Sequence, residues 1–178
     1  MARRRPNVLI TGTPGTGKTT LCEAVAGATG LEHVNVGDVV KREGCHEGVD
    51  EEFDSLILDE EKLLAVLEPR LEEGNVLLDF HTCDIFEADQ LDLVLVLTSE
   101  TEQLFDRLKA RGYSQSKVTE NMDCEIMHVV VEDARQAFPE EMVHVLPSNT
   151  IEDLETNVER VQQWMESWLQ EHHRGSTD

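Results

Sequence analysis

Eight residues near the start of the chain have types and spacing suited to holding phosphate. They run Gly12-Thr-Pro-Gly-Thr-Gly-Lys18-Thr19 and match the pattern G-x-x-x-x-G-K-[ST] in full. The glycines let successive backbone N–H groups turn toward phosphate oxygens, and the dipole of a following helix favours the same anion. Lys18 then reaches the β- and γ-phosphates, and the Thr19 hydroxyl ligates Mg²⁺. The segment predicts binding of a nucleoside triphosphate, ATP with Mg²⁺.

An aspartate and a histidine follow an apolar run that has the character of a buried strand. Asn75-Val-Leu-Leu-Asp79 ends in a carboxylate. An aspartate at such a strand end holds Mg²⁺ or its water in phosphate-loop proteins. His81 lies two residues on and shares a face with Asp79 if the chain is extended. We therefore expect Asp79 to hold the metal and His81 to orient a water or an acceptor group. The alternatives are a turn-capping Asp79 and a structural His81.

Two arginines stand out because the chain is otherwise so acidic. Arg107 and Arg111 are four residues apart, in the segment Arg107-Leu-Lys-Ala-Arg-Gly-Tyr113, so a helix places them on one face. Phosphoryl transfer spreads negative charge that arginine stabilises. Gly112 then breaks the helix, which suits a mobile flap that excludes water. The alternative is a solvated helix face paired with nearby acidic side chains.

Short apolar runs alternate with helical patterns along the chain, which places these residues. The runs predict buried parallel strands over Val8–Thr11, His33–Val36, Val76–Asp79, Leu93–Leu97 and Val143–Leu146. Helices are expected over Lys18–Ala28, Glu100–Arg111 and Thr119–Phe138. A further helix is expected from Asp59 to Gly74, with a bend or an early end at Pro69. The last helix is expected to begin at a Thr150/Asp153 capping box and to end in a frayed tail at 172–178. The pattern predicts one domain over 1–178, a three-layer α/β/α phosphate-loop NTPase fold with a five-stranded parallel sheet.

Composition narrows the possible partners and compartments. The net charge of −22 argues against a broad face for nucleic acid and is compatible with either simple solubility or attraction to a basic protein. The sequence has no apolar stretch long enough to span a membrane and no secretory signal, so an intracellular protein is expected. The four cysteines are widely spaced, which favours reduced thiols over zinc ligation.

The motifs together resemble a specific family. The chain is similar to the adenylate kinase isoenzyme 6 family, also described as a coilin-interacting nuclear ATPase and a small-ribosomal-subunit assembly factor. The resemblance covers about residues 7–170 and rests on Gly12–Thr20, Asn35–Asp38, Asp50–Asp54, Ile57–Glu60, Asp79-Phe-His-Thr-Cys-Asp84, Arg107–Tyr113, Cys124–Ile126 and Leu146-Pro-Ser-Asn149. The Asp79–Asp84 and Leu146–Asn149 segments are the more specific ones, because a phosphate loop alone is generic.

The resemblance implies roles for individual residues. It implies ATP contacts at Gly15, Thr16, Gly17, Lys18, Thr19, Thr20, Arg107, Arg111, Ser148 and Asn149, with Arg107 lying against the adenine. It implies a nucleoside monophosphate (NMP) region at about 35–58, with Asn35, Gly37, Asp38, and Lys41 or Arg42 as binding residues, and a lid at about 110–120. Catalytic roles fall on Lys18, Asp79, His81 and Arg111, and Mg²⁺ on Thr19 and, through water, Asp79. The short lid lacks a four-cysteine site, so no zinc is expected.

The resemblance also implies activities and partners. The family is similar to adenylate kinases, which transfer phosphate from ATP to AMP, and it has ATPase activity. It acts in small-subunit maturation on pre-ribosomal particles, where it holds a basic ribosomal protein, and is found in the nucleus and cytoplasm. We therefore expect an ATP:AMP phosphotransferase with ATPase activity. The alternatives are an ATPase switch for the ribosomal protein with little kinase activity, and a small-metabolite kinase of the shikimate or gluconate type.

Overall fold

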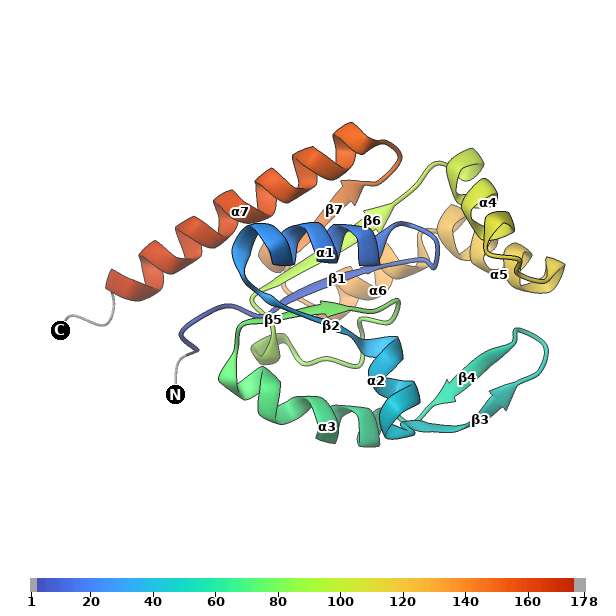
Figure 1. Ribbon diagram of the computed structural model, residues 1–178, viewed down its shortest axis with the longest axis horizontal. Coiled ribbons are helices and arrows are strands. Elements are labelled where there is room, and N and C mark those ends of the chain that lie inside the picture. Colours follow the sequence, from blue (N-terminus) through green and yellow to red (C-terminus); the bar gives the residue numbers. More distant parts are fainter. Residues whose placement is uncertain (1–2, 175–178) are drawn as a thin grey trace.

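A five-stranded parallel sheet forms the centre of the protein, in a computed structural model that describes residues 3–174. The strand order is β2-β5-β1-β6-β7 (Figure 1). The strands are β1 (Val8–Gly12), β2 (Glu32–Asn35), β5 (Val76–Asp79), β6 (Leu93–Thr98) and β7 (Val143–Pro147). Each predicted strand is present, with bounds within one residue of the prediction. β1 lies between β5 and β6, so the phosphate loop that follows it emerges from the middle of the sheet.

Helices cover both faces of this sheet, which confirms the predicted three-layer fold. In β1, Val8 and Ile10 pack against α1 (Lys18–Thr29) and α7 (Ile151–Arg174), whereas Leu9 packs in the core beneath α3 (Glu60–Glu73) and α6 (Val129–Ala137). Successive side chains of a strand point to opposite faces, so one apolar run supplies both cores. Within residues 3–174, no helix combines the length and apolar character needed to cross a membrane.

Two peripheral groups of elements flank the carboxyl ends of the strands. One consists of α2 (Val36–Glu43) and an antiparallel hairpin of β3 (His46–Asp50) and β4 (Ser55–Leu58). The other is the helix pair α4 (Thr101–Ala110) and α5 (Gln115–Ile126). Figure 1 shows both groups at the same end of the molecule, with the hairpin below the helix pair. Short 3₁₀ turns, η1 (Ala88–Gln90) and η2 (Glu140–Met142), lead into β6 and β7.

The structure corrects two of the helix predictions. The single helix expected over Thr119–Phe138 is two helices, α5 and α6, because His128 takes a left-handed conformation with φ 53°. Neither glycine nor proline marks this break in the sequence. Pro69 does not shorten α3, which continues to Glu73. The carbonyl of Ala65 that loses its partner there belongs to an exposed residue, so water can satisfy it.

The structure bears on both predicted ends of the last helix, α7. Its start has the predicted cap, since the Asp153 carboxylate accepts from the Thr150 backbone N–H at 3.2 Å and the Thr150 hydroxyl accepts from the Asp153 N–H at 3.1 Å. α7 continues to Arg174, so residues 172–174 of the predicted frayed tail are helical. The remainder of that tail, 175–178, lies outside the described residues.

Candidate active site

The phosphate loop, residues 12–19, connects the end of β1 to the first turn of α1. Its Lys18 ammonium donates to the carbonyls of Gly12 and Thr13 at 2.9 and 3.2 Å, so the side chain lies back across the loop. Loss of hydration lowers the pKa of Lys18 to about 8, against an opposing effect of the Asp79 charge. The Lys18 ammonium therefore lies beside the loop that is predicted to bind the triphosphate.

Gly15 shows why this loop requires glycine. Its φ is +95°, a conformation that side chains rarely adopt. A Cβ atom here would also lie 2.9 Å from Cδ1 of Leu104, a fully buried residue of α4. The loop therefore approaches α4 more closely than any residue with a side chain would allow.

Asp79 ends β5 directly beside the loop. In the sheet it is paired with Ile10 of β1 and with Asn35 of β2. Its Oδ2 accepts a hydrogen bond from the Thr19 hydroxyl at 2.7 Å. A hydroxyl and a carboxylate are the hard oxygen ligands that Mg²⁺ takes, so the donors present fit this ion. Thr19 and Asp79 would hold it, directly or through water, and bound Mg²⁺ would neutralise charge on the phosphates.

Asp79 has a second partner, His33, which the sequence did not predict. His33 Nε2 lies 3.0 Å from the same Oδ2 atom, with the His33 side chain largely buried. His33 is paired with Leu77 in the β2–β5 ladder, so it is the diagonal neighbour of Asp79 on the same face. Only the strand register brings these two residues together, and no local motif marks it.

His81 follows β5 and faces the cleft beside the loop. Its side chain is exposed, but it belongs to the lining of the cleft. Its ring meets that of Phe80 edge-on, with the two ring centroids 4.6 Å apart. Reduced hydration lowers the pKa of His81 to about 4, and the charges of Lys18 and Lys117 contribute in the same direction. The imidazole is therefore neutral at neutral pH and can accept a hydrogen bond.

A cleft of about 620 Å³ joins the predicted groups from both sides. Residues predicted from the sequence that line it are Lys18, Thr19, Asn35, Gly37, Asp38, Lys41, Asp79, His81 and Arg111. The cleft also includes Lys117 of α5, which the sequence did not single out. The Lys117 ammonium donates to the Asp54 carbonyl in the β3–β4 turn at 3.3 Å and lies 4.1 Å from the Tyr113 ring centroid. The lid region and the hairpin thus meet across the cleft.

Arg107 connects the phosphate loop to the loop after β7. Its Nη1 donates to the carbonyls of Ser148 and Gly15 at 2.8 and 3.3 Å, and to the Ser99 hydroxyl at 3.1 Å. Its Nη2 donates to the Asn149 carbonyl at 3.3 Å, and the Ser148 hydroxyl donates to the Thr16 carbonyl. Arg107, Ser148 and Asn149 therefore lie beside the phosphate loop but outside the lining of the cleft. Their predicted contacts with the nucleotide stay predictions.

The NMP region lines another part of the cleft, and the structure distinguishes between its two candidate AMP-binding cations, Lys41 and Arg42. The Asn35 carboxamide caps α2 by accepting from the Asp38 N–H at 3.1 Å. Lys41 lines the cleft. Arg42 is 60% exposed, pairs with its neighbour Glu43 at 2.9 Å, and is not part of the lining. Of the two alternatives that the sequence left open, the geometry favours Lys41.

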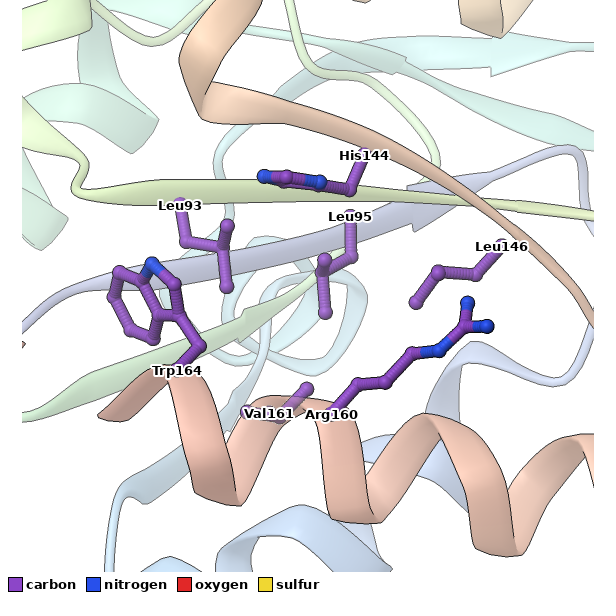
Figure 2. Close-up of a pocket in the computed structure, with 7 residues that line it drawn as sticks. All are labelled: Leu93, Leu95, His144, Leu146, Arg160, Val161 and Trp164. Carbon is purple, nitrogen blue, oxygen red and sulfur yellow. The ribbon is translucent and has the colours of Figure 1, made fainter. Parts of the chain in front are cut away.

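A smaller cavity lies elsewhere, between α7 and the strands β6 and β7 (Figure 2). It has a volume of about 330 Å³ and a mostly aliphatic floor, formed by Leu93, Leu95 and Leu146. Trp164 and Arg160 from α7 and His144 from β7 border it. It shares no residue with the cleft beside the phosphate loop. It is therefore not part of the candidate active site.

The fold and site together define a phosphate-loop nucleotide kinase, and comparisons with known proteins agree. A family profile described as "AAA domain" matches residues 8–128. The chain is 46% identical over 170 residues to the adenylate kinase isoenzyme 6 homolog of Schizosaccharomyces pombe, covering 96% of this chain and 97% of the relative. It is 42% identical over 171 residues to the homolog of Dictyostelium discoideum, covering 96% and 98%. The chain belongs to the adenylate kinase isoenzyme 6 family, and it is an enzyme.

Solved structures add support for the fold alone. The chain resembles the crystal structure of shikimate kinase from Bacteroides thetaiotaomicron with a TM-score of 0.62, covering 90% of this chain and 98% of that one. The two sequences are only 18% identical. This likeness confirms the phosphate-loop kinase architecture and says nothing about the substrate. The family membership, in contrast, favours a nucleotide over a small metabolite as the acceptor.

Proposed function

We propose that this protein transfers the γ-phosphate of ATP to AMP, giving two molecules of ADP. The observation that carries the proposal is the single cleft in which the phosphate loop faces an acceptor wall. Lys18 and Thr19 lie on one side, and Asn35, Gly37 and Lys41 on the other. A volume of about 620 Å³ is in the range of small-molecule sites. The nearness of these two groups of residues supports the proposal that a donor and an acceptor phosphate bind next to each other.

The reaction breaks the bond between the γ-phosphorus and the bridging oxygen and forms a bond to an oxygen of the AMP phosphate. In-line transfer of this kind depends on positioning and on stabilising charge rather than on covalent catalysis. We assign Lys18 and the loop N–H groups to the β- and γ-phosphates, and Arg111 to the transferring group. Lys41 binds the AMP phosphate. Lys117 closes the cleft through Asp54, which excludes water.

ATP hydrolysis is the same reaction with water as the acceptor. We propose that it proceeds slowly when AMP is absent and that His81 positions the water. The neutral imidazole supports this role, since a base must be unprotonated to accept a hydrogen bond from water. The runner-up function, an ATPase switch with little kinase activity, uses the same residues without the acceptor wall.

The test measures ADP formation from ATP and Mg²⁺ in parallel with AMP, CMP, GMP, UMP and no acceptor. A kinase gives a rate with AMP that saturates and far exceeds the rate without it. His81→Ala should reduce hydrolysis more than it reduces transfer to AMP. Slow hydrolysis that no nucleotide accelerates would rule out the kinase and leave the ATPase switch.

We further propose a role in maturation of the small ribosomal subunit, with a basic ribosomal protein on pre-ribosomal particles as the partner. The net charge of −22 supports a basic partner, and the resemblance supports the setting, which includes both nucleus and cytoplasm. If nucleotide acts as a switch, the nucleotide-free and ATP-bound forms must differ in affinity for that protein. Calorimetric titrations that give equal affinities would contradict the switch.

A further inference from the structure

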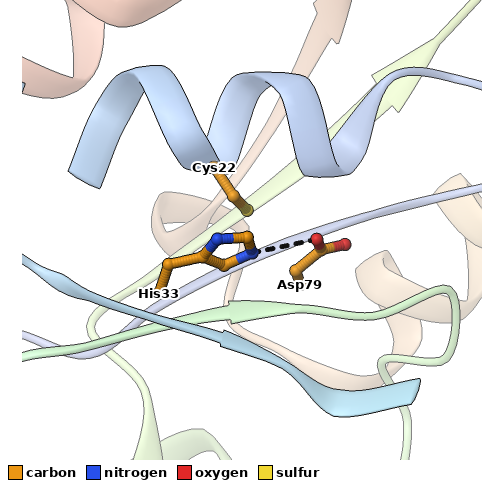
Figure 3. A group of neighbouring side chains, drawn as sticks. All are labelled: Cys22, His33 and Asp79. Carbon is orange, nitrogen blue, oxygen red and sulfur yellow. Dashed lines mark hydrogen bonds and ion pairs between the residues drawn. The ribbon is translucent and has the colours of Figure 1, made fainter. Parts of the chain in front are cut away.

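Three side chains from three different elements meet beneath helix α1 (Figure 3). Cys22 comes from α1, His33 from β2 and Asp79 from the end of β5. One ligand atom from each lies within 4.8 Å of the other two. Figure 3 shows the Cys22 sulfur pointing toward the His33 ring, whose Nε2 faces the Asp79 carboxylate. Tetrahedral Zn²⁺ would hold such atoms about 3.3–3.6 Å apart, given its bond lengths. Small movements of these three side chains would therefore bring their ligand atoms to the distances that a bound cation requires.

The donor set selects a class of cation. Mg²⁺ and Ca²⁺ take oxygen ligands, whereas a thiolate and an imidazole together with a carboxylate suit Zn²⁺ and Co²⁺. We propose that Cys22, His33 and Asp79 form a binding site for a thiophilic divalent cation, and that its occupation inhibits phosphate transfer by taking Asp79 away from Thr19. The sequence predicted no zinc because the lid lacks clustered cysteines, and it could not show that the fold brings Cys22 to His33.

The hydrogen bonds around Asp79 show how a cation would fit. His33 Nε2 and Asp79 Oδ2 are 3.0 Å apart, so two ligand atoms already face each other. A cation held between them would bind both atoms and reach the Cys22 sulfur on its remaining side. The thiol is fully buried, but Asp79 borders the open cleft, so a cation reaches the cluster past the carboxylate. Three protein ligands leave a fourth position for water.

The Asp79 carboxylate of the cluster is buried, with 4% of its area exposed, and a dication can supply its counter-charge. A bound dication stabilises the thiolate and neutralises the carboxylate. The Lys18 ammonium lies close by, but the carbonyls of Gly12 and Thr13 hold it.

The cation and magnesium-bound ATP compete for the same carboxylate. Asp79 Oδ2 accepts from Thr19 at 2.7 Å, and we assigned these two residues to Mg²⁺. A cation drawn toward Cys22 and His33 would pull the carboxylate from that position. The binding of the cation is independent of the proposed function, whereas its inhibitory effect rests on it.

The binding experiment uses Co²⁺ as the probe, because a cobalt–thiolate bond produces a charge-transfer absorption. The nucleotide-free protein is titrated with Co²⁺, and Zn²⁺ is then added to displace it. We expect one Co²⁺ per chain with thiolate absorption that Zn²⁺ abolishes. Cys22→Ala should remove the absorption, and His33→Gln should weaken binding by about tenfold or more. Cys45→Ala is the matched control, since Cys45 is also buried but lies in the core on the other face of the sheet.

Two results would overturn the site. One is a folded wild-type protein that gives no thiolate absorption with Co²⁺. The other is thiolate absorption that persists unchanged in folded Cys22→Ala, or Co²⁺ affinity that is unchanged in folded His33→Gln. Using both variants, with circular dichroism as the check on folding, protects the test if one of them fails to fold.

The inhibitory effect has its own test. Adding Mg²⁺ and ATP should suppress the cobalt absorption in proportion to nucleotide occupancy, and buffered Zn²⁺ should slow ATP turnover in wild type and Cys45→Ala alike. Absorption that is the same with and without nucleotide would refute the competition. Failure of the proposed function is seen separately, as a lack of transfer to AMP in protein freed of Zn²⁺ with a chelator.

Discussion

The hydroxyl of Thr19 and the carboxylate of Asp79 are joined by a 2.7 Å hydrogen bond across 60 residues of sequence. Thr19 belongs to the first turn of α1, and Asp79 to the carboxyl end of β5. The bond forms because β5 is paired directly with β1, so the two strand ends that carry the phosphate loop and the carboxylate are neighbours. The same two oxygens are those that Mg²⁺ would use.

Replacement of Thr19 separates the roles of its hydroxyl and its methyl group. Thr19→Ala removes one Mg²⁺ ligand, so we expect the Mg²⁺ concentration for half-maximal activity to rise about tenfold or more. Thr19→Ser keeps the hydroxyl and is the control, with a Mg²⁺ requirement close to wild type. The measurement is initial rate against free Mg²⁺ at saturating ATP. Equal requirements in both variants would remove Thr19 from the metal site.

Nucleotide binding should take up protons at alkaline pH. The pKa of Lys18 is lowered to about 8 in the nucleotide-free protein, so part of the population is neutral above that pH. Phosphates next to the amine favour its charged form and raise the pKa again. Binding of ATP therefore draws a proton from solution above pH 8 and none below about pH 7, and the affinity falls as pH rises through this range.

Calorimetry in buffers of different ionisation enthalpy measures this proton uptake directly. Wild type should show it at pH 8.5 and lose it at pH 6.5, and Lys18→Met should show none at either pH. Uptake in Lys18→Met equal to that of wild type would assign the proton to another group.

Two adjacent cations provide a matched pair for the acceptor site. Both side chains are exposed, but Lys41 lines the cleft, whereas Arg42 pairs with Glu43 outside the lining. If Lys41 binds the AMP phosphate, Lys41→Ala loses a charge-assisted hydrogen bond, which corresponds to about a 10- to 100-fold rise in KM for AMP. Arg42→Ala should leave that KM within about twofold, because an exposed pair contributes little. The reverse order would place Arg42 in the site.

Arg107 should support the nucleotide site through the loops it joins. Its guanidinium donates to Gly15, Ser99, Ser148 and Asn149, a set that a compact ammonium cannot span. Arg107→Lys is expected to lower the free energy of unfolding by about 1–3 kcal/mol and to raise KM for ATP. Arg135→Lys, at an exposed pair with Glu132, is the control with little effect. Urea denaturation and steady-state kinetics check both, and unchanged stability in Arg107→Lys would contradict the loop-joining role.

The sequence predicted those parts of the fold and site that depend on local patterns. The strands are continuous apolar runs because both faces are buried, and the phosphate loop is a contiguous motif. Asp79 was predicted because it ends such a run. The β3–β4 hairpin was not, since its strands are short, partly exposed and interrupted by a bulge at His46/Gly48.

The remaining features depend on how distant segments come together. His33 contacts Asp79 only because β2 pairs with β5 in one register, and a shift by one residue would point it to the other face. Lys117 reaches Asp54 because the lid region and the hairpin lie at the same end of the sheet. Neither contact leaves a local signal in the sequence.

The partition of labelled phosphate tests the central claim most directly. The protein is supplied with ATP labelled at the γ-phosphate, Mg²⁺ and AMP, and the products are separated. Transfer within the cleft predicts that most of the label appears in ADP, and that it shifts to inorganic phosphate only when AMP is omitted. Label found in inorganic phosphate at the same rate with and without AMP would contradict the account and leave an ATPase.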